Sequence, residues 1–385
     1  MHRRLAEYYV GCCFSSAEGT IRKSSSKFCT AAVVGQVLEA GSLPTSVQEA
    51  LDIAPIPFTT TELMRSAQCP PHERWRHGRW TQWQAALRIA RNVKHFERLP
   101  PELRRTDAFQ DMEVSAIRWF DTIVNLPPVS RENHSHFVRY MSSISRKEKP
   151  ILPLISSAIL GAKGANIDPF LHDFCTCRIS WRLLLNHHWV VRSSSGTGVI
   201  NPFCDPLHLA EAALGQVRDL CCDHYGIRPV SSIQRNTERT IEHVDANVQY
   251  ILMELIKNAM KATIDSDNKE MPVIVEMNDT VLEDQHAINV RIIDQGRGIS
   301  EGMKQTIWKY GWSTVSMSAT ELQSVQNRDE EVFRAPRIAG WGCGLPLAKC
   351  YAEHFGGTLE LFSGEGEGCE ARLTLPVIGK ERAIV

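Results

Sequence analysis

The sequence has no long apolar run, no dominant charge and no cysteine spacing typical of a zinc site. No stretch approaches the roughly 20 apolar residues needed to cross a bilayer, so we expect no membrane span. Lysine and arginine (43) nearly balance aspartate and glutamate (44). The formal net charge of −1 gives no general attraction to nucleic acid, and we expect no nucleic-acid partner.

The sequence has 12 cysteines, but none of them form a C-x-x-C pair. At 385 residues the chain is long enough for two domains with cores of their own, so it does not need disulfides. We therefore expect reduced thiols in an intracellular compartment, most of them buried.

The first eighty residues are interpreted as two segments that precede the folded domains. Residues 1–30 are basic, rich in serine and poor in acids, which favours a mitochondrial targeting segment over an ordinary tail. Residues 31–80 contain several prolines and are expected to form a loosely ordered lead-in. The basic and aromatic cluster at 74–80 is too short for a nucleic-acid-binding stripe and is interpreted as a tethering turn.

Residues 81–195 are predicted to be helical. We expect helices at Trp83–Glu97 and Asp107–Asn125, each halted by a pair of prolines. A third begins near Ser130 and is interrupted by prolines, and a fourth covers Pro169–Val190, with Asp168 as its N-cap. Four long helices with short breaks predict a four-helix bundle.

Residues 200–378 alternate between helical and strand patterns, which predicts an open sheet with helices on one face. The fold class expected for the whole chain is therefore a two-domain α+β protein, with an α/β sandwich after the bundle. The segment 315–339 is polar and is interpreted as a mobile lid over a ligand site.

Three motifs in the second domain carry chemistry. In the first, Glu254-Leu-Ile-Lys-Asn258, an acid and an amide four residues apart share one helix face. The carboxylate can accept a proton and the amide oxygen can bind Mg²⁺. Taken alone, such a pair is more often a solvated helix face. Of the neighbouring Lys257 and Lys261, one is a candidate to approach a phosphate, but solvated lysines on the outer face are the expectation.

The second motif, Asp294-Gln-Gly296-Arg-Gly298, follows an alternating strand pattern at 287–293. Its aspartate is placed to accept a hydrogen bond from a purine amino group, and its glycines leave room for a flat ligand. Taken alone, the motif is more often an ordinary turn.

The third motif, Gly340-Trp-Gly342-Cys-Gly344-Leu345-Pro346, runs into an amphipathic helix. Glycines before a helix N-terminus expose backbone N–H groups to an anion, which predicts a phosphate site. The Lys-Ser/Thr of a P-loop is missing, so it is not that kind of site.

In this order the three motifs resemble the N, G1 and G2 boxes of the GHKL ATPase superfamily. Residues 254–263 and 340–357 resemble the mitochondrial pyruvate and branched-chain 2-oxoacid dehydrogenase kinases, and Tyr250-Ile-Leu252 looks most like the branched-chain member. Residues 170–188 resemble a helix of the N-terminal bundle of that family. The resemblance extends from about residue 85 to residue 378.

The resemblance implies an ATP-dependent protein serine kinase of the mitochondrial matrix, with ATP and Mg²⁺ as cofactors. Its substrate would be a component of a 2-oxoacid dehydrogenase complex, pyruvate or branched-chain, which phosphorylation inactivates. The bundle would dock on that complex, a lipoyl domain is a further candidate dock, and the family suggests a homodimer. Some members carry a longer C-terminal tail that grips the lipoyl domain, whereas this sequence ends soon after its last predicted strand. Docking through such a tail therefore stays open.

The resemblance also assigns roles to residues. Glu254 would be the general base, Asn258 would bind Mg²⁺ and Asp294 would bind the adenine amino group. The adenine would lie against Gly296 and Gly298, with Ser313 and Thr314 beside it. The phosphates would lie in the segment formed by Gly340, Trp341, Gly342, Cys343, Gly344 and Leu345.

Two departures from the family and two alternatives stay open. A threonine that helps to hold adenine is replaced by Cys369, and an Arg-His pair of the bundle is replaced by Arg146-Lys147. A sensor histidine kinase would need an exposed phosphoacceptor, for which His172-Asp173 is the candidate. A non-catalytic ATP-gated binding module or chaperone would have no need of Glu254.

Overall fold

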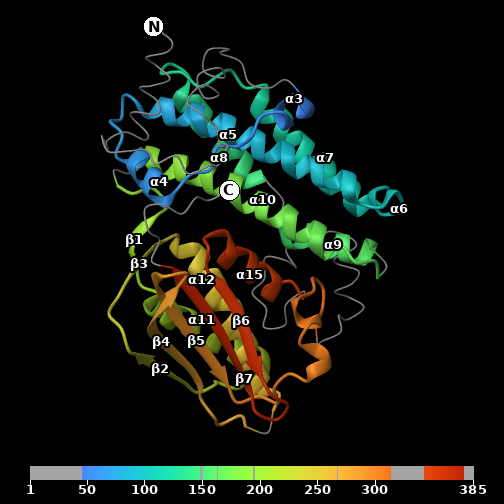
Figure 1. Cartoon of the computed structure of the whole chain (residues 1–385), viewed down its shortest axis with the longest axis vertical. Helices are drawn as coiled ribbons and strands as arrows, with labels where there is room; N and C mark the ends of the chain where they lie inside the picture. Colours follow the sequence, from blue (N-terminus) through green and yellow to red (C-terminus); the bar gives the residue numbers. More distant parts are fainter. Residues whose placement is uncertain are drawn as a thin grey trace.

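The structure is a computed structural model that describes residues 46–147, 151–162, 164–193, 196–266, 268–313 and 342–376. The fold is α+β with two domains, a helical one followed by a sheet covered by helices (Figure 1). The expected targeting segment at 1–30 and the expected lid at 315–339 lie outside the described residues. No helix in the described ranges has the length and apolar character required to cross a membrane.

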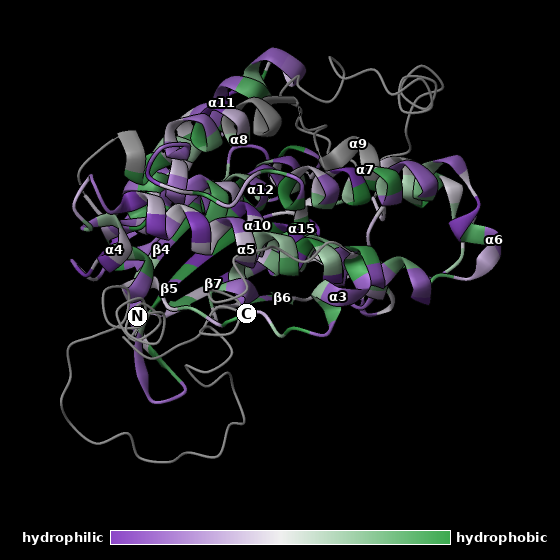
Figure 2. Ribbon diagram, turned by 90° about the horizontal axis from the view of Figure 1, so that it is seen from above, coloured by the Kyte–Doolittle hydropathy of each residue, from purple (hydrophilic) through white to green (hydrophobic). Residues whose placement is uncertain are grey.

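The N-terminal domain consists of helices, with the 3-10 turn η1 (Phe96–Arg98) after the longest early one. The helices are α3 (Val47–Leu51), α4 (Thr60–Ala67), α5 (Arg74–His95), α6 (Pro101–Arg104), α7 (Asp107–Val124), α8 (His134–Lys147), α9 (Ile151–Gly161) and α10 (Asp168–Ser193). In Figure 2 the long helices carry both hydrophilic and hydrophobic residues, as expected of helices with a buried face. Helix α5 packs on α7 and α10, and its small buried residues Ala85, Ala86 and Ala90 permit a close approach.

The expected loose lead-in at 31–80 is wrong for its described part. Helices α3 and α4 begin with capping boxes formed by Ser46 with Glu49 and by Thr59 with Glu62. Helix α5 begins at Arg74 rather than near Trp83, so the cluster at 74–80 is its first two turns and not a turn before it. These short helices are held by tertiary packing, because Ala50 of α3 joins a buried cluster with Trp83, and Leu63 of α4 joins another with Trp80.

The C-terminal domain is built on a five-stranded sheet of order β2-β4-β5-β7-β6. Strand β2 runs parallel to β4 and the other neighbours are antiparallel. The strands are β2 (Ser231–Arg235), β4 (Val273–Leu282), β5 (Gln285–Asp294), β6 (Thr358–Ser363) and β7 (Cys369–Pro376). A separate pair joins β1 (Asn201–Cys204) to β3 (Ile241–His243).

Helices cover one face of this sheet. They are α11 (Pro206–Tyr225), α12 (Asp245–Ile264) and α15 (Gly344–His354), and their apolar residues form one core with the inward residues of the strands. Asp205 caps α11 by accepting from the N–H groups of Leu207 and His208. The domain therefore has a helical layer and a strand layer (Figure 1).

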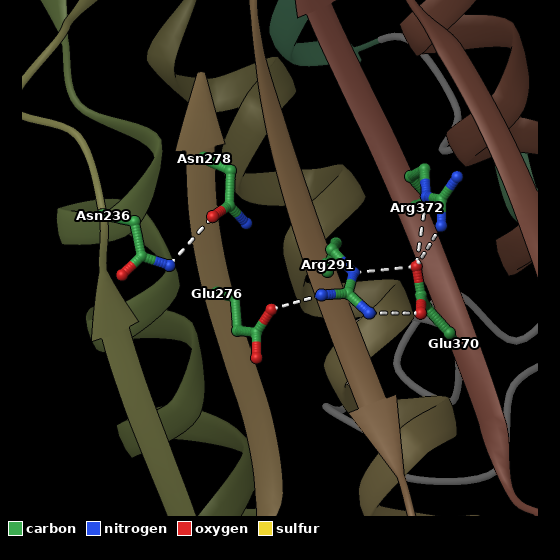
Figure 3. A network of polar contacts seen from close by, with 6 residues as sticks. All are labelled: Asn236, Glu276, Asn278, Arg291, Glu370 and Arg372. Atoms are coloured by element: carbon green, nitrogen blue, oxygen red, sulfur yellow. Dashed lines mark hydrogen bonds and ion pairs between the residues drawn. The ribbon is translucent and has the colours of Figure 1, made fainter. Parts of the chain in front are cut away.

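The other sheet face carries a polar network that crosses three strands (Figure 3). Arg291 of β5 and Arg372 of β7 are opposite each other in register, and both donate to the carboxylate of Glu370. Arg291 also pairs with Glu276 of β4. Because Glu370 lies between the two arginines, it offsets their mutual repulsion, and its bonds to Arg291 lower the pKa of its carboxyl to about 2.

The two domains share a core. One buried cluster contains residues of the helical domain, such as Phe170 and Leu171, together with Leu347 and Cys350 of α15. Helix α15 thus touches α10 on one side and α12 on the other. The N-terminus of α15, which carries the third motif, is fixed from both domains.

Candidate functional site

A cavity of about 480 Å³ lies between α12, the ends of β5 and β7, and the N-terminus of α15. It brings together eight of the predicted site residues, which are Glu254, Asn258, Asp294, Gly298, Ser313, Gly342, Gly344 and Leu345. Gly296 and Cys343 adjoin the cavity without lining it. Thr314, Gly340 and Trp341 lie outside the described residues.

Helix α12 provides the acid and the amide. Its buried residues, which include Leu252 and Ile256, pack in the core with the sheet, and this orientation leaves Glu254 and Asn258 on the cavity. The expectation of solvated lysines beside them is wrong. Lys257 donates to Glu254 across 2.6 Å with only 13% of its side chain exposed, and Lys261 lines the cavity and pairs with Asp265.

Asp294 ends strand β5 and forms one end of the cavity. Its Oδ1 accepts the backbone N–H groups of Gly296 at 2.9 Å and of Cys369 at 3.2 Å. Burial raises the pKa of this carboxyl to about 6, against the lowering effect of both bonds. The backbone N–H group of Cys369 thus orients Asp294, and Cys369 itself lines the cavity.

Gly298 of the second motif and Gly368 of the turn between β6 and β7 are required by close packing. A Cβ on Gly298, whose φ is +71°, would lie 1.9 Å from the carbonyl oxygen of Gly364. On Gly368 a Cβ would lie 2.2 Å from the carbonyl oxygen of Asp294. The turn between β6 and β7 therefore packs directly on the loop after β5, and a side chain at either glycine separates them.

The other end of the cavity is the N-terminus of α15. Gly342 has a φ of +70°, and its carbonyl accepts the N–H group of Gly311 at 2.9 Å. Gly344 begins the helix, and a Cβ there would lie 2.3 Å from Oε2 of Glu254. The partial positive charge of the helix N-terminus therefore lies beside the carboxylate, where it can also receive an anion.

The remaining wall was not predicted from the sequence. It is largely apolar and comes from several elements, with Ala262, Ile292, Met303, Ile307, Trp312, Leu361 and Ala371 among its residues. Helical spacing is the one signal that identifies part of it, since Ala262 and Asp265 follow Glu254 and Asn258 along one face of α12. A flat aromatic base fits the apolar wall near Asp294, and an anionic group fits the opposite end.

Comparison with known proteins agrees with this geometry. Residues 57–203 match the family described as mitochondrial branched-chain alpha-ketoacid dehydrogenase kinase. Residues 244–378 match the family described as histidine kinase-, DNA gyrase B- and HSP90-like ATPase. The chain belongs to the mitochondrial 2-oxoacid dehydrogenase kinase family of the GHKL superfamily.

Several relatives in this kinase family align over most of their length. The chain is 26% identical over 366 residues to pyruvate dehydrogenase kinase isozyme 4 of Rattus norvegicus, covering 89% of this chain and 86% of the relative. It is 25% identical over 371 residues to the Homo sapiens isozyme 4, covering 90% and 87%. The Arabidopsis thaliana pyruvate dehydrogenase kinase is 25% identical over 309 residues, covering 76% and 82%. Membership of an ATPase superfamily makes ATP the ligand expected in the cavity.

Proposed function

We propose that this protein is an ATP-dependent serine kinase that phosphorylates and inactivates a component of a mitochondrial 2-oxoacid dehydrogenase complex. Its family membership supports the reaction, and the relatives are named as mitochondrial pyruvate dehydrogenase kinases. The matching family at 57–203 is named for the branched-chain complex instead. Both complexes are therefore candidate substrates, and the mitochondrial matrix is the proposed location.

The single observation that carries this proposal is the position of Glu254 in the cavity. The carboxylate adjoins Gly344 at the N-terminus of α15, whereas Gly296, beside Asp294, adjoins Ala262, which lies about two turns further along α12. With adenine at Asp294 and the phosphates along Gly342, Gly344 and Leu345, the terminal phosphate comes closest to Glu254. Glu254 would then accept the proton of the serine hydroxyl as that oxygen attacks the terminal phosphorus, a contribution of about 10²–10⁴-fold.

The donor set also fits Mg²⁺. Asn258 lies one helical turn after Glu254 on the cavity wall, and its carboxamide oxygen is a hard ligand of the kind that Mg²⁺ prefers. When bound, the ion offsets the charge that develops on the transferred phosphoryl group. Asn258 would hold the ion, and Lys261, which lines the same wall, would lie near the phosphates.

The helical domain is proposed to be a four-helix bundle that docks on the dehydrogenase complex, followed by a GHKL-type α/β sandwich. Its longest helices, α5, α7, α8 and α10, would form the bundle. A homodimer and docking through a lipoyl domain belong to the same proposal and rest on the family resemblance. Sedimentation of the purified protein, alone and with isolated lipoyl domain, would test both.

The test of the function is Glu254→Gln. The purified chain is incubated with labelled ATP and with each dehydrogenase complex, and acid-stable phosphate on the dehydrogenase is measured. We expect the variant to retain ATP binding by calorimetry and to lose about a hundredfold or more in phosphotransfer. Glu353→Gln, on the half-exposed side of α15, is the matched control and is expected to transfer at the wild-type rate. Unchanged transfer by Glu254→Gln removes this carboxylate from the mechanism.

The two alternatives make different predictions. A histidine kinase would place acid-labile phosphate on this chain. The side chain of the candidate acceptor, His172, contacts Cys350. The neighbouring residue in the sequence, Asp173, forms an ion pair with Arg98 instead of assisting His172 as an acid. A binding module or chaperone would bind ATP and transfer nothing to either complex. Family membership favours the serine kinase over both.

A further inference from the structure

We propose that Lys257 is a positioning residue for Glu254. It directs the carboxylate towards the phosphate end of the cavity and offsets its negative charge there. The inference rests on the proposed kinase function and adds a residue to it. It does not require Lys257 to touch ATP or the acceptor serine.

The two oxygens of Glu254 have different surroundings. Oε1 accepts from Nζ of Lys257 at 2.6 Å, while Oε2 is the oxygen that a Cβ on Gly344 would approach to 2.3 Å. Lys257 therefore occupies one oxygen and leaves the other directed towards the N-terminus of α15. An unpaired glutamate side chain has three rotatable bonds and samples several directions, so the pair restricts the orientation of the base.

The two lysines of α12 differ in whether they line the cavity. Glu254 is part of the cavity wall, whereas Lys257 is not among the wall residues and contacts Glu254 instead. Lys261 is part of the wall and pairs forward with Asp265. Lys257 thus reaches the site through Glu254, while Lys261 reaches it directly.

The positive charge of Lys257 also offsets the repulsion between Glu254 and the phosphates. Glu254 and the phosphates are both anionic, and their repulsion is stronger in a partly buried site than in water. Two other neighbours that the charge of Glu254 affects, Tyr250 and Cys343, are neutral. Burial first, with Glu254 as a lesser cause, raises the pKa of the Cys343 thiol to about 12 and that of Tyr250 well above its ordinary value. Lys257 supplies the positive charge in this group.

The pair is also more enclosed than an ordinary surface pair. The side chains of Lys257 and Glu254 are 13% and 15% exposed. Glu301 and Lys304 have the same i, i+3 spacing but are 87% and 42% exposed, and neither lines the cavity. The second pair is therefore a matched control within the same chain.

The experiment compares Lys257→Met, Lys257→Arg and the control Lys304→Met in the full-length protein. Phosphotransfer to the dehydrogenase gives kcat, and calorimetry with Mg²⁺ gives the Kd of ATP. We expect Lys257→Met to lower kcat about tenfold or more with the Kd changed by less than about threefold. Lys257→Arg is expected to recover most of kcat because it keeps the charge, and Lys304→Met is expected to match the wild type.

A double-mutant comparison tests whether Lys257 acts through Glu254. In the Glu254→Gln background, Lys257→Met is expected to cause no further loss of transfer. The inference is overturned if kcat stays within about twofold of wild type, if the loss is the same in both backgrounds, or if ATP affinity falls as much as kcat. If the methionine variant fails to fold, Lys257→Arg and Lys257→Gln in the same two backgrounds decide it. Absence of transfer by the wild type, in contrast, contradicts the proposed function itself.

Discussion

Asp294 shows how local contacts define the role of one residue. One oxygen accepts two backbone N–H groups, which fixes the plane of the carboxylate. Burial opposes these bonds and raises the pKa to about 6, so the group is ionised at neutral pH but close to its titration range. A carboxylate held in this way can select a base by accepting from its amino group.

Asp294→Asn is expected to weaken the binding of ADP about 10- to 100-fold, because it replaces the acceptor of a charge-assisted hydrogen bond. The same carboxylate makes binding depend on pH. Its ionised form binds the amino group, so affinity is highest above about pH 6 and falls as the pH drops through that value. Calorimetric titrations between about pH 7.5 and pH 5 measure both effects.

The control for that prediction is Asp279→Asn, on the exposed part of β4, which is expected to bind ADP as the wild type does. The pH dependence attributed to Asp294 is expected to be absent in Asp294→Asn. If affinity in this variant falls on acidification as steeply as in the wild type, another group controls binding.

Secondary-structure elements with local signals were predictable from the sequence. The pair Pro127-Pro128 predicts the end of α7 to within one residue, since the helix ends at Val124. Asp168 and Pro169 likewise predict the start of α10. The start of α5 was missed, because its first turns are charged and contain Gly78. A Cβ at Gly78 would lie 2.9 Å from Nε2 of His188, so this glycine reflects packing with α10 that no local pattern records.

In the candidate site, too, some residues could be predicted from local motifs and others depend on tertiary packing. Glu254, Asp294 and Gly344 belong to motifs in which a few adjacent residues fix the chemistry, so their types and spacing were sufficient. The Lys257–Glu254 pair and the apolar wall depend on how α12 and α15 approach each other. From the sequence alone, a lysine beside a motif is expected to be solvated, because the sequence does not show which helix packs against it.

The contact between two turns leads to a prediction at the scale of elements. Gly298→Ala places a methyl group against the carbonyl of Gly364, at a φ that side chains rarely adopt, and is expected to cost about 1–3 kcal/mol of stability. Because the same loop carries Asp294, we also expect weaker ADP binding. Thermal unfolding and calorimetry measure the two effects.

The matched control is Gly302→Ala, in the 3-10 turn η2 (Glu301–Met303). A Cβ there meets nothing within 4 Å, and its backbone is not in the left-handed region. We expect wild-type stability and binding for this variant. Equal melting temperatures for Gly298→Ala and the wild type would show that the two turns separate without cost.

For the molecule as a whole, buried histidines connect elements in both domains. In the helical domain, a chain of imidazoles joins His77 of α5 to His188 of α10 and on to His134 of α8. His187 donates to the hydroxyl of Ser66 in α4 and accepts the N–H group of Val199. In the second domain, His243 is buried near the contact between domains, and so is the Nε2 atom of the partly buried His354. Both domains therefore contain imidazoles that folding removes from water.

These histidines predict that acid destabilises the protein. Burial lowers the pKa of His187 and of His243 to about 4 and that of His354 to about 3, and it lowers the pKa of His77 well below its usual range. The unfolded chain, with pKa values near 6.5, then binds more protons than the folded one below that pH. Stability is therefore complete above about pH 6.5 and is lost as the pH falls towards 4, by about 2 kcal/mol at pH 5 for His187 and for His243.

Urea unfolding at about pH 7.5, 6 and 5 measures this dependence, and replacement of one histidine tests its origin. His187→Gln keeps a side chain that can bond Ser66 but does not titrate, so we expect a shallower loss of stability on acidification even if the variant is less stable at neutral pH. His208→Gln, on the exposed side of α11, is the control and is expected to keep the wild-type slope.

Asp294 acts in the opposite direction, because its raised pKa makes the folded state the better proton acceptor between about pH 6 and pH 4. Glu62, whose pKa burial also raises, acts as Asp294 does, whereas His95, whose pKa burial lowers, acts with the four imidazoles. The imidazoles outnumber the opposing carboxyls, so the net slope has their sign, and an increase in stability on acidification would mean that these rings are hydrated in the folded protein.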